Sequence, residues 1–413
     1  MSFELGGISL SITGISVLML SVLLVAAVGY MLGRITIKGV ALGTAGVFVV
    51  ALLFGAFFWK PLSNQLVLAT GQEGVSVNYA TNALKIVENM GLIFFVTAVG
   101  FIAGPNFFKN LKKNFKSYIV LGVIAILVGG LTAAVCIFIG RTGTSDYDEL
   151  TAIVVGLLSG SLTSTPAFAA TKEAVGPALE DAVTSGHAIS YLFGVIGVVL
   201  FVQLMPKLLG ADMQAEREKL IIVDSGSKKK GAKDKKIIDV DPFGFMAFML
   251  AGMLGLFVGS INFFNFFSLT TTGGCLIMAL VLGHFGKVGR INIMPKQQVL
   301  EAFRELGLML FLIGAGIPGG AKFVEYFKFS YFVYGIFMTL VPMIVAFLFA
   351  KYVLKLSLLN NLGSVTGAMT STPALGTLIH TAGTGDVASA YAATYPIALI
   401  AVVLVSEILI KIL

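Results

Sequence analysis

Long apolar runs separated by short polar stretches dominate the chain. Four of the clearest runs cover residues 12–33, 40–58, 118–140 and 331–350. A helix needs about 20 apolar residues to cross a hydrocarbon core that is about 30 Å thick. Each run therefore predicts a membrane-spanning helix, and the whole pattern predicts an all-α polytopic membrane protein.

One long polar stretch, residues 208–242, interrupts this pattern. It is rich in Lys, Asp, Gly and Ser, which is typical of a solvated linker, although residues 215–220 (AEREKL) favour a short helix. The sequence therefore divides into three parts. They are an N-terminal membrane repeat (residues 1–207), a cytoplasmic linker (residues 208–242) and a C-terminal inverted membrane repeat (residues 243–413).

The two sides of the linker resemble each other in the same order. GYMLG at residues 29–33 matches GLFVG at 255–259, and residues 91–108 match residues 307–324. The pattern G-x3-G-x2-TSTPA begins at Gly156 and again at Gly363, and residues 188–200 match residues 392–404. Four matches in register indicate an internal duplication.

Charged residues predict how each half crosses the membrane, because Lys and Arg favour cytoplasmic loops. Basic residues follow the first and third apolar segments (Arg34, Lys109), whereas acidic residues follow the second and fourth (Glu73, Asp146). The Lys-rich linker can then lie inside only if the fifth segment returns to the side from which it entered. The prediction is two inverted repeats, each with about five transmembrane helices and one re-entrant hairpin, and with both termini outside. This architecture is typical of secondary transporters.

The TSTPA motifs lie at the predicted hairpin tips. Residues 150–162 and 167–179 form arms of roughly 20 Å, which reach just past the bilayer midplane. Proline suits the first turn of the second arm, and Ser164 or Thr165 can cap that helix. Since helix N-termini attract anions, two tips with six hydroxyl groups predict a site for a small carboxylate. The predicted substrate-binding residues are Thr163, Ser164, Thr165, Pro166, Thr370, Ser371, Thr372 and Pro373.

Other residues are candidates for a second wall of this site. They are the glycines of VTAVGFIAGP and LIGAGIPGG and the matched polar residues that follow each hairpin. Simple helix packing explains the glycines equally well. The candidates are Gly100, Gly314, Gly316, Ser190, Tyr191, Thr394 and Tyr395. No Lys or Arg occurs between Leu150 and Thr171 or between Leu356 and Lys411.

Composition narrows the function further. Only 12% of residues are charged, against about 25% in soluble domains. The net charge of +7 lies in short loops and the linker, so it indicates topology, with no nucleic-acid partner. The Lys run of the linker favours a plain charged loop, with contact to anionic membrane lipid as the alternative. His187, His284 and His380 are scattered, so no metal site or cofactor is expected. Glu88, Glu173 and Glu407 are expected near segment ends or in polar surroundings, which leaves Na+ or H+ coupling open.

The paired G-x3-G-x2-TSTPA segments, the six-plus-six layout and the central break resemble the aspartate:alanine exchanger family. The resemblance implies a secondary transporter of the bacterial inner membrane that exchanges small carboxylates such as aspartate, alanine or succinate-like dicarboxylates. Many members carry a large regulatory insert between the halves, which this chain replaces with a short linker. The hypothesis is an elevator or rocking exchanger, functioning as a homodimer, in which the hairpins and third segments carry the substrate.

Two other functions are alternatives to carboxylate exchange. A cation/proton antiporter needs acidic residues at the helix breaks, where this chain has hydroxyls. An intramembrane aspartyl protease would use Asp148 and Asp386, but Pro-Ala-Leu at 373–375 precedes the glycine string at 383–386 instead of following it. The chain is therefore not expected to be an enzyme.

Overall fold

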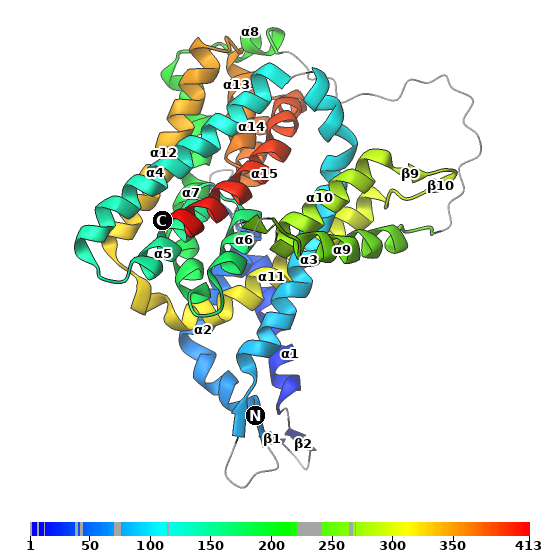
Figure 1. Ribbon diagram of the computed structural model, residues 1–413, viewed down its shortest axis with the longest axis vertical. Helices are drawn as coiled ribbons and strands as arrows, with labels where there is room; N and C mark the ends of the chain where they lie inside the picture. The colour runs from blue at the N-terminus through cyan, green and yellow to red at the C-terminus, as the bar shows by residue number, and fades with distance from the viewer. Residues whose placement is uncertain are drawn as a thin grey trace.

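The protein is almost entirely helical in a computed structural model (Figure 1). The structure describes residues 2–5, 8–11, 13–37, 40–41, 44–69, 76–113, 115–220, 241–263, 267–268 and 270–413. The helices before residue 209 are α1 (Ile15–Gly33), α2 (Ala45–Gln65), α3 (Ala80–Lys113), α4 (Val120–Gly140), α5 (Tyr147–Ser161), α6 (Thr165–Val175) and α7 (Glu180–Leu208). The later ones are α8 (Met213–Glu218), α9 (Phe245–Gly259), α10 (Thr270–Phe285), α11 (Gln297–Tyr326), α12 (Phe329–Tyr352), α13 (Leu358–Ala368), α14 (Thr372–Ala382) and α15 (Ala388–Ile412).

Short elements connect the helices. A π-helical turn (Phe115–Ile119) precedes α4, and 3-10 turns occupy Arg141–Gly143 and Gly385–Val387. Within the described ranges, five antiparallel two-stranded ladders lie at chain turns. Their strands are β1 (Ser2–Leu5) with β2 (Ile8–Ser11), β3 (Thr36–Ile37) with β4 (Val40–Ala41), β5 (Val67–Ala69) with β6 (Ser76–Asn78), β7 (Asn262–Phe263) with β8 (Phe267–Ser268), and β9 (Lys287–Val288) with β10 (Ile291–Asn292).

The helices have the length and composition of membrane spans. In the described part of the chain, eight helical stretches are long and apolar enough to cross a bilayer, and they correspond to α1–α4, α7, α11, α12 and α15. The helices α9 and α10 are shorter but apolar. Apolar side chains also point outward, for example Leu23 (67% exposed) on α1 and Phe257 (66% exposed) on α9. Such surfaces suit lipid, so the chain is a multi-pass membrane protein.

The helices pack into two bundles. Helices α1–α3 and α9–α11 contact one another through the pairs α1–α2, α2–α11, α3–α11, α3–α10 and α9–α10; we call them the flanking bundle. Helices α4–α7 and α12–α15 form the hairpin bundle, around which most of the largest buried core is built. Figure 1 shows α4, α12 and α13 at the upper left, α1 and α2 at the lower end, and α9 and α10 at the right.

The third segments, α3 and α11, were predicted to move with the hairpins, but they pack mainly within the flanking bundle. They contact each other extensively, α3 also packs on α10, and α11 also packs on α2. The contacts of α11 with α7 and of α3 with α15 are smaller. Close approach of glycines is the physical reason. A Cβ added at Gly55 of α2 would lie 1.9 Å from the carbonyl oxygen of Ile317 in α11. The two backbones can meet only because the side chain is missing.

The linker is described only as far as residue 220, and residues 221–240 lie outside the described part. Its first segment forms α8, whose Glu216 Oε2 accepts a hydrogen bond (3.2 Å) from the backbone N–H of Leu358, where α13 begins. Helix α7 ends at Leu208, where the predicted linker begins.

Candidate functional site

The first TSTPA motif forms the tip between α5 and α6. The N–H of Thr163 donates to the Gly160 carbonyl (2.9 Å), and the N–H of Ser164 donates to the Ser159 carbonyl (2.8 Å). This pair of bonds is a Schellman closure, which normally places glycine in the left-handed region. Here Thr163 takes that place, with φ of 52°.

The second motif closes α13 in the same way. The N–H of Thr370 donates to the Gly367 carbonyl (3.1 Å), the N–H of Ser371 donates to the Thr366 carbonyl (3.2 Å), and φ of Thr370 is 51°. Two motifs with the same sequence therefore make the same unusual turn.

The two tips are in direct contact. The Thr163 hydroxyl donates to the Met369 carbonyl (2.9 Å), and the Thr370 hydroxyl donates to the Leu162 carbonyl (2.8 Å). Leu162 and Met369 precede the threonines at equivalent positions. All four residues are buried, so these reciprocal bonds fasten one hairpin to the other inside the protein.

The helices that start at the tips differ in their caps. Ser164 Oγ accepts from the N–H of Ala167 (3.3 Å), which caps α6, and Thr165 and Pro166 begin that helix. Ser371 makes no such bond, and its fully buried hydroxyl has no hydrogen-bond partner within the described structure. Helix α14 therefore begins without a side-chain cap. Thr372 and Pro373 form its first turn, but only their backbone lies in the described part.

The arms end at identifiable signals. The first arm begins at Tyr147, earlier than predicted, because Asp146 Oδ1 accepts from the N–H of Glu149 (3.0 Å) and caps it. The second arm ends at Val175, earlier than residue 179, because Gly176 takes φ of 77°. With ψ of 170°, this is a backbone conformation that essentially only glycine adopts, and it cannot continue the helix.

Ser190 and Thr394 lie behind the first arm of each hairpin. The Ser190 hydroxyl donates to the Leu157 carbonyl (2.7 Å), and a Cβ added at Gly160 would meet Ser190 Oγ at 2.2 Å. The Thr394 hydroxyl donates within its own helix to Ala390, and its Cβ stands 3.3 Å from the position of a Cβ at Gly367. Both residues therefore support the arms at matching glycines.

Tyr191 and Tyr395 belong to aromatic stacks. The His187 ring lies between Phe168 of α6 (4.1 Å between centroids) and Tyr191 (4.9 Å), and Tyr395 stacks on Tyr391 (5.0 Å). The Ser159 hydroxyl lies within hydrogen-bond distance of both the Gly156 carbonyl (2.7 Å) and His187 Nδ1 (2.8 Å). The other ring nitrogen, His187 Nε2, is buried and has no hydrogen-bond partner in the described residues.

The three candidate glycines lie at helix contacts. Added Cβ atoms would approach Ala279 of α10 at Gly100 (2.6 Å), Glu88 of α3 at Gly314 (2.6 Å), and Ala51 of α2 at Gly316 (2.8 Å). The structure therefore gives each of them a packing role in the flanking bundle.

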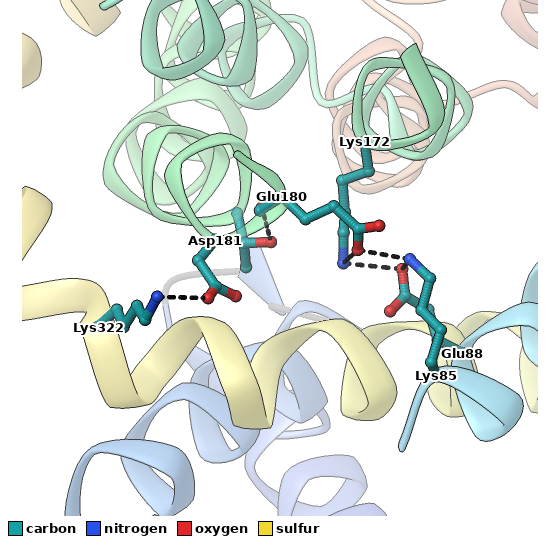
Figure 2. A network of polar contacts seen from close by, with 7 residues as sticks. Lys85, Glu88, Lys172, Glu180, Asp181 and Lys322 are labelled. Atoms are coloured by element: carbon teal, nitrogen blue, oxygen red, sulfur yellow. Dashed lines mark hydrogen bonds and ion pairs between the residues drawn. The ribbon is translucent and has the colours of Figure 1, made fainter. Parts of the chain in front are cut away.

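A buried ion-pair network lies beside the hairpin of α5 and α6, which we call hairpin 1 (Figure 2). Lys172 of α6 is 2.8 Å from Glu88 of α3 and 3.4 Å from Glu180 of α7, and Lys85 of α3 pairs with the same two glutamates. The side chains of Lys172 and Glu88 are only 5% exposed. At the edge of the network, Lys322 of α11 pairs with Asp181 of α7 at 3.3 Å.

Sequence reasoning missed this network. Glu88 was expected near a segment end or in polar surroundings; it lies inside α3, is buried, and has charged partners. Lys85 is three residues away on the same helix, but Lys172 comes from α6, which is distant in sequence, so spacing alone does not bring Lys172 to Glu88. The available signal was the presence of charges of both signs, Lys85, Glu88 and Lys172, within or beside apolar segments, where charged residues are costly and need partners.

The arrangement is suited to binding a small anion. Two helix N-termini meet at buried tips with hydroxyl groups, and one of them, α14, is uncapped. Asp148 and Asp386 are both exposed at helix ends, away from these buried tips.

Known proteins point to transport. The chain is 26% identical to an uncharacterized transporter of Bacteroides fragilis (94% of this chain, 97% of the relative) and to one of Bacteroides thetaiotaomicron with the same coverage. It is 23% identical to an uncharacterized transporter of Desulfotalea psychrophila (94% and 96%). These alignments extend over 552 positions, so the relatives carry residues that this 413-residue chain lacks.

A family model described as a predicted permease membrane region, Asp-Al_Ex, matches residues 21–207 and 247–411. The gap in the match falls on the polar linker, and the matched residues include both TSTPA tips. The chain therefore belongs to the aspartate–alanine exchanger family of membrane transporters.

Proposed function

We propose that the protein is a secondary active exchanger of small carboxylates in the bacterial inner membrane. Its substrate, an amino acid such as aspartate or alanine or a dicarboxylate such as succinate, binds where the TSTPA tips meet. The predicted binding residues of both tips, 163–166 and 370–373, form this site. The observation that carries the proposal is the uncapped N-terminus of α14 beside the buried, unpartnered Ser371 hydroxyl.

The physical argument starts from what a buried hydroxyl and uncapped N–H groups need. A buried polar group without a partner costs about 1–3 kcal/mol, and a helix N-terminus favours negative charge. A carboxylate seated on α14 would accept bonds from both. It would need no Lys or Arg, in agreement with the absence of basic residues at the tips.

Exchange follows from the chemistry of this site. Helix dipoles and hydroxyls lose their hydration when the tips are buried, so an empty site is less stable than a filled one. The change between outward-facing and inward-facing states is then easier with bound substrate than with an empty site. The hairpin bundle moves against the flanking bundle in an elevator-like step, and the apolar outer faces of α1 and α9 meet lipid or the second copy of a homodimer.

Counterflow into proteoliposomes tests the proposal. Vesicles loaded with unlabelled amino acids or dicarboxylates should take up the labelled compound, and Ser371→Val should abolish this uptake because it fills the site and removes the hydroxyl. Ser21→Val is the matched control, because Ser21 is a buried serine of α1 that bonds only to Val17 of its own helix. Equal uptake by the Ser371→Val variant and the wild type would refute the assignment.

A further inference from the structure

Glu407 is a buried carboxylate that the proposed exchange site does not use. It lies inside α15 and is fully buried, and neither carboxylate oxygen has a hydrogen-bond partner within the described structure. The hydroxyl of the adjacent Ser406 is also buried and unpartnered. The sequence predicts Glu407 near a segment end or in polar surroundings; it lies close to the C-terminal end of α15, and the polar atoms of Glu407 and Ser406 have no hydrogen-bond partner there within the described structure.

A second carboxylate, Glu173 of α6, lies within electrostatic reach of Glu407. Glu173 Oε2 accepts a hydrogen bond from the N–H of Thr272 (3.3 Å), in the first turn of α10. The first turn of α10 therefore supplies a hydrogen bond and the positive end of a helix to the Glu173 carboxylate. A negative charge on Glu173 opposes a negative charge on Glu407.

The nearby cations do not neutralise Glu407 by direct contact. Lys411, four residues further along α15, acts on Glu407 electrostatically from the exposed end of the helix. Lys172 precedes Glu173 but is engaged by Glu88 and Glu180. Lys85 attracts Glu173 electrostatically, but it forms ion pairs with Glu88 and Glu180. The Cys275 thiol is another titratable group that interacts electrostatically with Glu173.

An unpaired buried carboxylate is costly, and only a proton or a bound cation removes that cost. A sodium ion needs several oxygen ligands around it. No described donor or acceptor reaches Glu407, and the described residues hold no group of three acidic, His or Cys side chains suited to a metal ion. A proton needs only the carboxylate itself.

We propose that Glu407, faced by Glu173, is a proton-binding site, and that the proton bound there moves in step with the carboxylate substrate. The coupling part of this proposal rests on the proposed exchange function. Helix α6 connects the two sites, because its N-terminus forms the tip at Thr165, it packs on α15, and its later residue Glu173 acts electrostatically on Glu407. Helix α6 packs on both α10 and α15, so movement of hairpin 1 changes the surroundings of Glu407 and its affinity for a proton.

Thermal unfolding of the purified protein against pH tests proton binding without any transport. The folded wild type holds a proton that the unfolded chain releases, so its Tm should fall as pH rises. Glu407→Gln should flatten this fall, and Glu407→Asp should keep it. Glu173→Gln should move the fall to lower pH, because it removes the negative neighbour. Glu325→Gln, at an exposed glutamate of α11, is the control and should match the wild type. Parallel profiles for wild type and Glu407→Gln would overturn the site.

Proteoliposomes with and without a pH gradient test the coupling. One proton per substrate allows a gradient of one pH unit to raise accumulation by up to about tenfold, since a tenfold ratio is worth about 1.4 kcal/mol. Wild type and Glu325→Gln should respond to the gradient, and Glu407→Gln should not. Wild-type exchange that ignores the gradient would overturn the coupling and leave the exchange function standing. A response to sodium that Glu407→Gln removes would overturn the choice of proton. Without any carboxylate uptake by the wild type, the exchange function and the coupling fail together, and the unfolding profiles decide the proton site.

Discussion

Thr163 and Thr370 adopt a backbone conformation that a β-branched side chain rarely takes, with φ of 52° and 51°. Such a conformation costs about 1–3 kcal/mol and persists only where the surroundings enforce it. Glycine would fit each turn without strain but would have no hydroxyl. Each threonine hydroxyl bonds the opposite tip, so the strained residue is the one that fastens the hairpins together.

Removing one of these hydroxyls should loosen the tip junction. Thr163→Val keeps the β-branched shape but leaves the Met369 carbonyl buried without its donor, which costs about 1–3 kcal/mol. Thermal unfolding should show a lower Tm for this variant, together with reduced counterflow. Thr163→Ser keeps the hydroxyl and is the control. Equal stability of the Val and Ser variants would mean that the bond to Met369 is unimportant.

The sequence predicted where the two tips lie, but not the backbone conformation of their residues. Proline after Thr165 and the Ser/Thr cap positions predicted where α6 begins, because these preferences are local. The left-handed threonines could not be predicted, since threonine disfavours that region and the compensating carbonyl belongs to the other half of the chain. The sequence also did not predict that Ser164 caps α6 whereas Ser371 does not cap α14, because the two motifs have the same sequence.

The helices α3, α6 and α7 are joined by buried charges. Lys172 and Lys85 face Glu88 and Glu180, so two cations and two anions balance in one network (Figure 2). The apolar pattern of the sequence predicted these helices, because that pattern is local. It could not predict that Lys172 pairs with Glu88, because the two residues meet only after α6 has packed beside α3.

Removing one charge from this network should lower the free energy of unfolding more than removing a cation and an anion together. Lys172→Met leaves Glu88 buried with one partner fewer, and the loss of one member of a buried pair costs about 3–5 kcal/mol. The double variant Lys172→Met, Glu88→Gln leaves Lys85 paired with Glu180, so it should recover much of that loss. Unfolding of the single and double variants measures the difference. Lys219→Met, at an exposed pair with Glu216 on α8, should change little. Additive single effects would contradict a coupled network.

The contacts of the whole molecule come in corresponding pairs across the linker. The contact of α2 with α11 corresponds to that of α10 with α3, and the contact of α12 with α7 corresponds to that of α4 with α15. Helix α6 packs on α15 as α14 packs on α7. An inverted repeat predicts this correspondence, because each half supplies the same surfaces to the other. The sequence predicted the relation between the two halves through matched glycines and TSTPA motifs. These residues limit how closely two backbones can approach more strictly than apolar residues do.

The predicted inverted arrangement also implies that the two hairpins enter the membrane from opposite sides. If the fifth segment returns to the outside and its counterpart returns to the inside, Gly143, before α5, faces outside and Gly385, after α14, faces inside. A Cβ at either position would meet nothing within 4 Å, so cysteine fits both. The native Cys136 and Cys275 are buried and are replaced by Ala. A membrane-impermeant maleimide should then label Gly143→Cys in intact cells and Gly385→Cys only after lysis. Labelling of both from the same side would rule out opposed hairpins, because a parallel repeat would place both positions on one face.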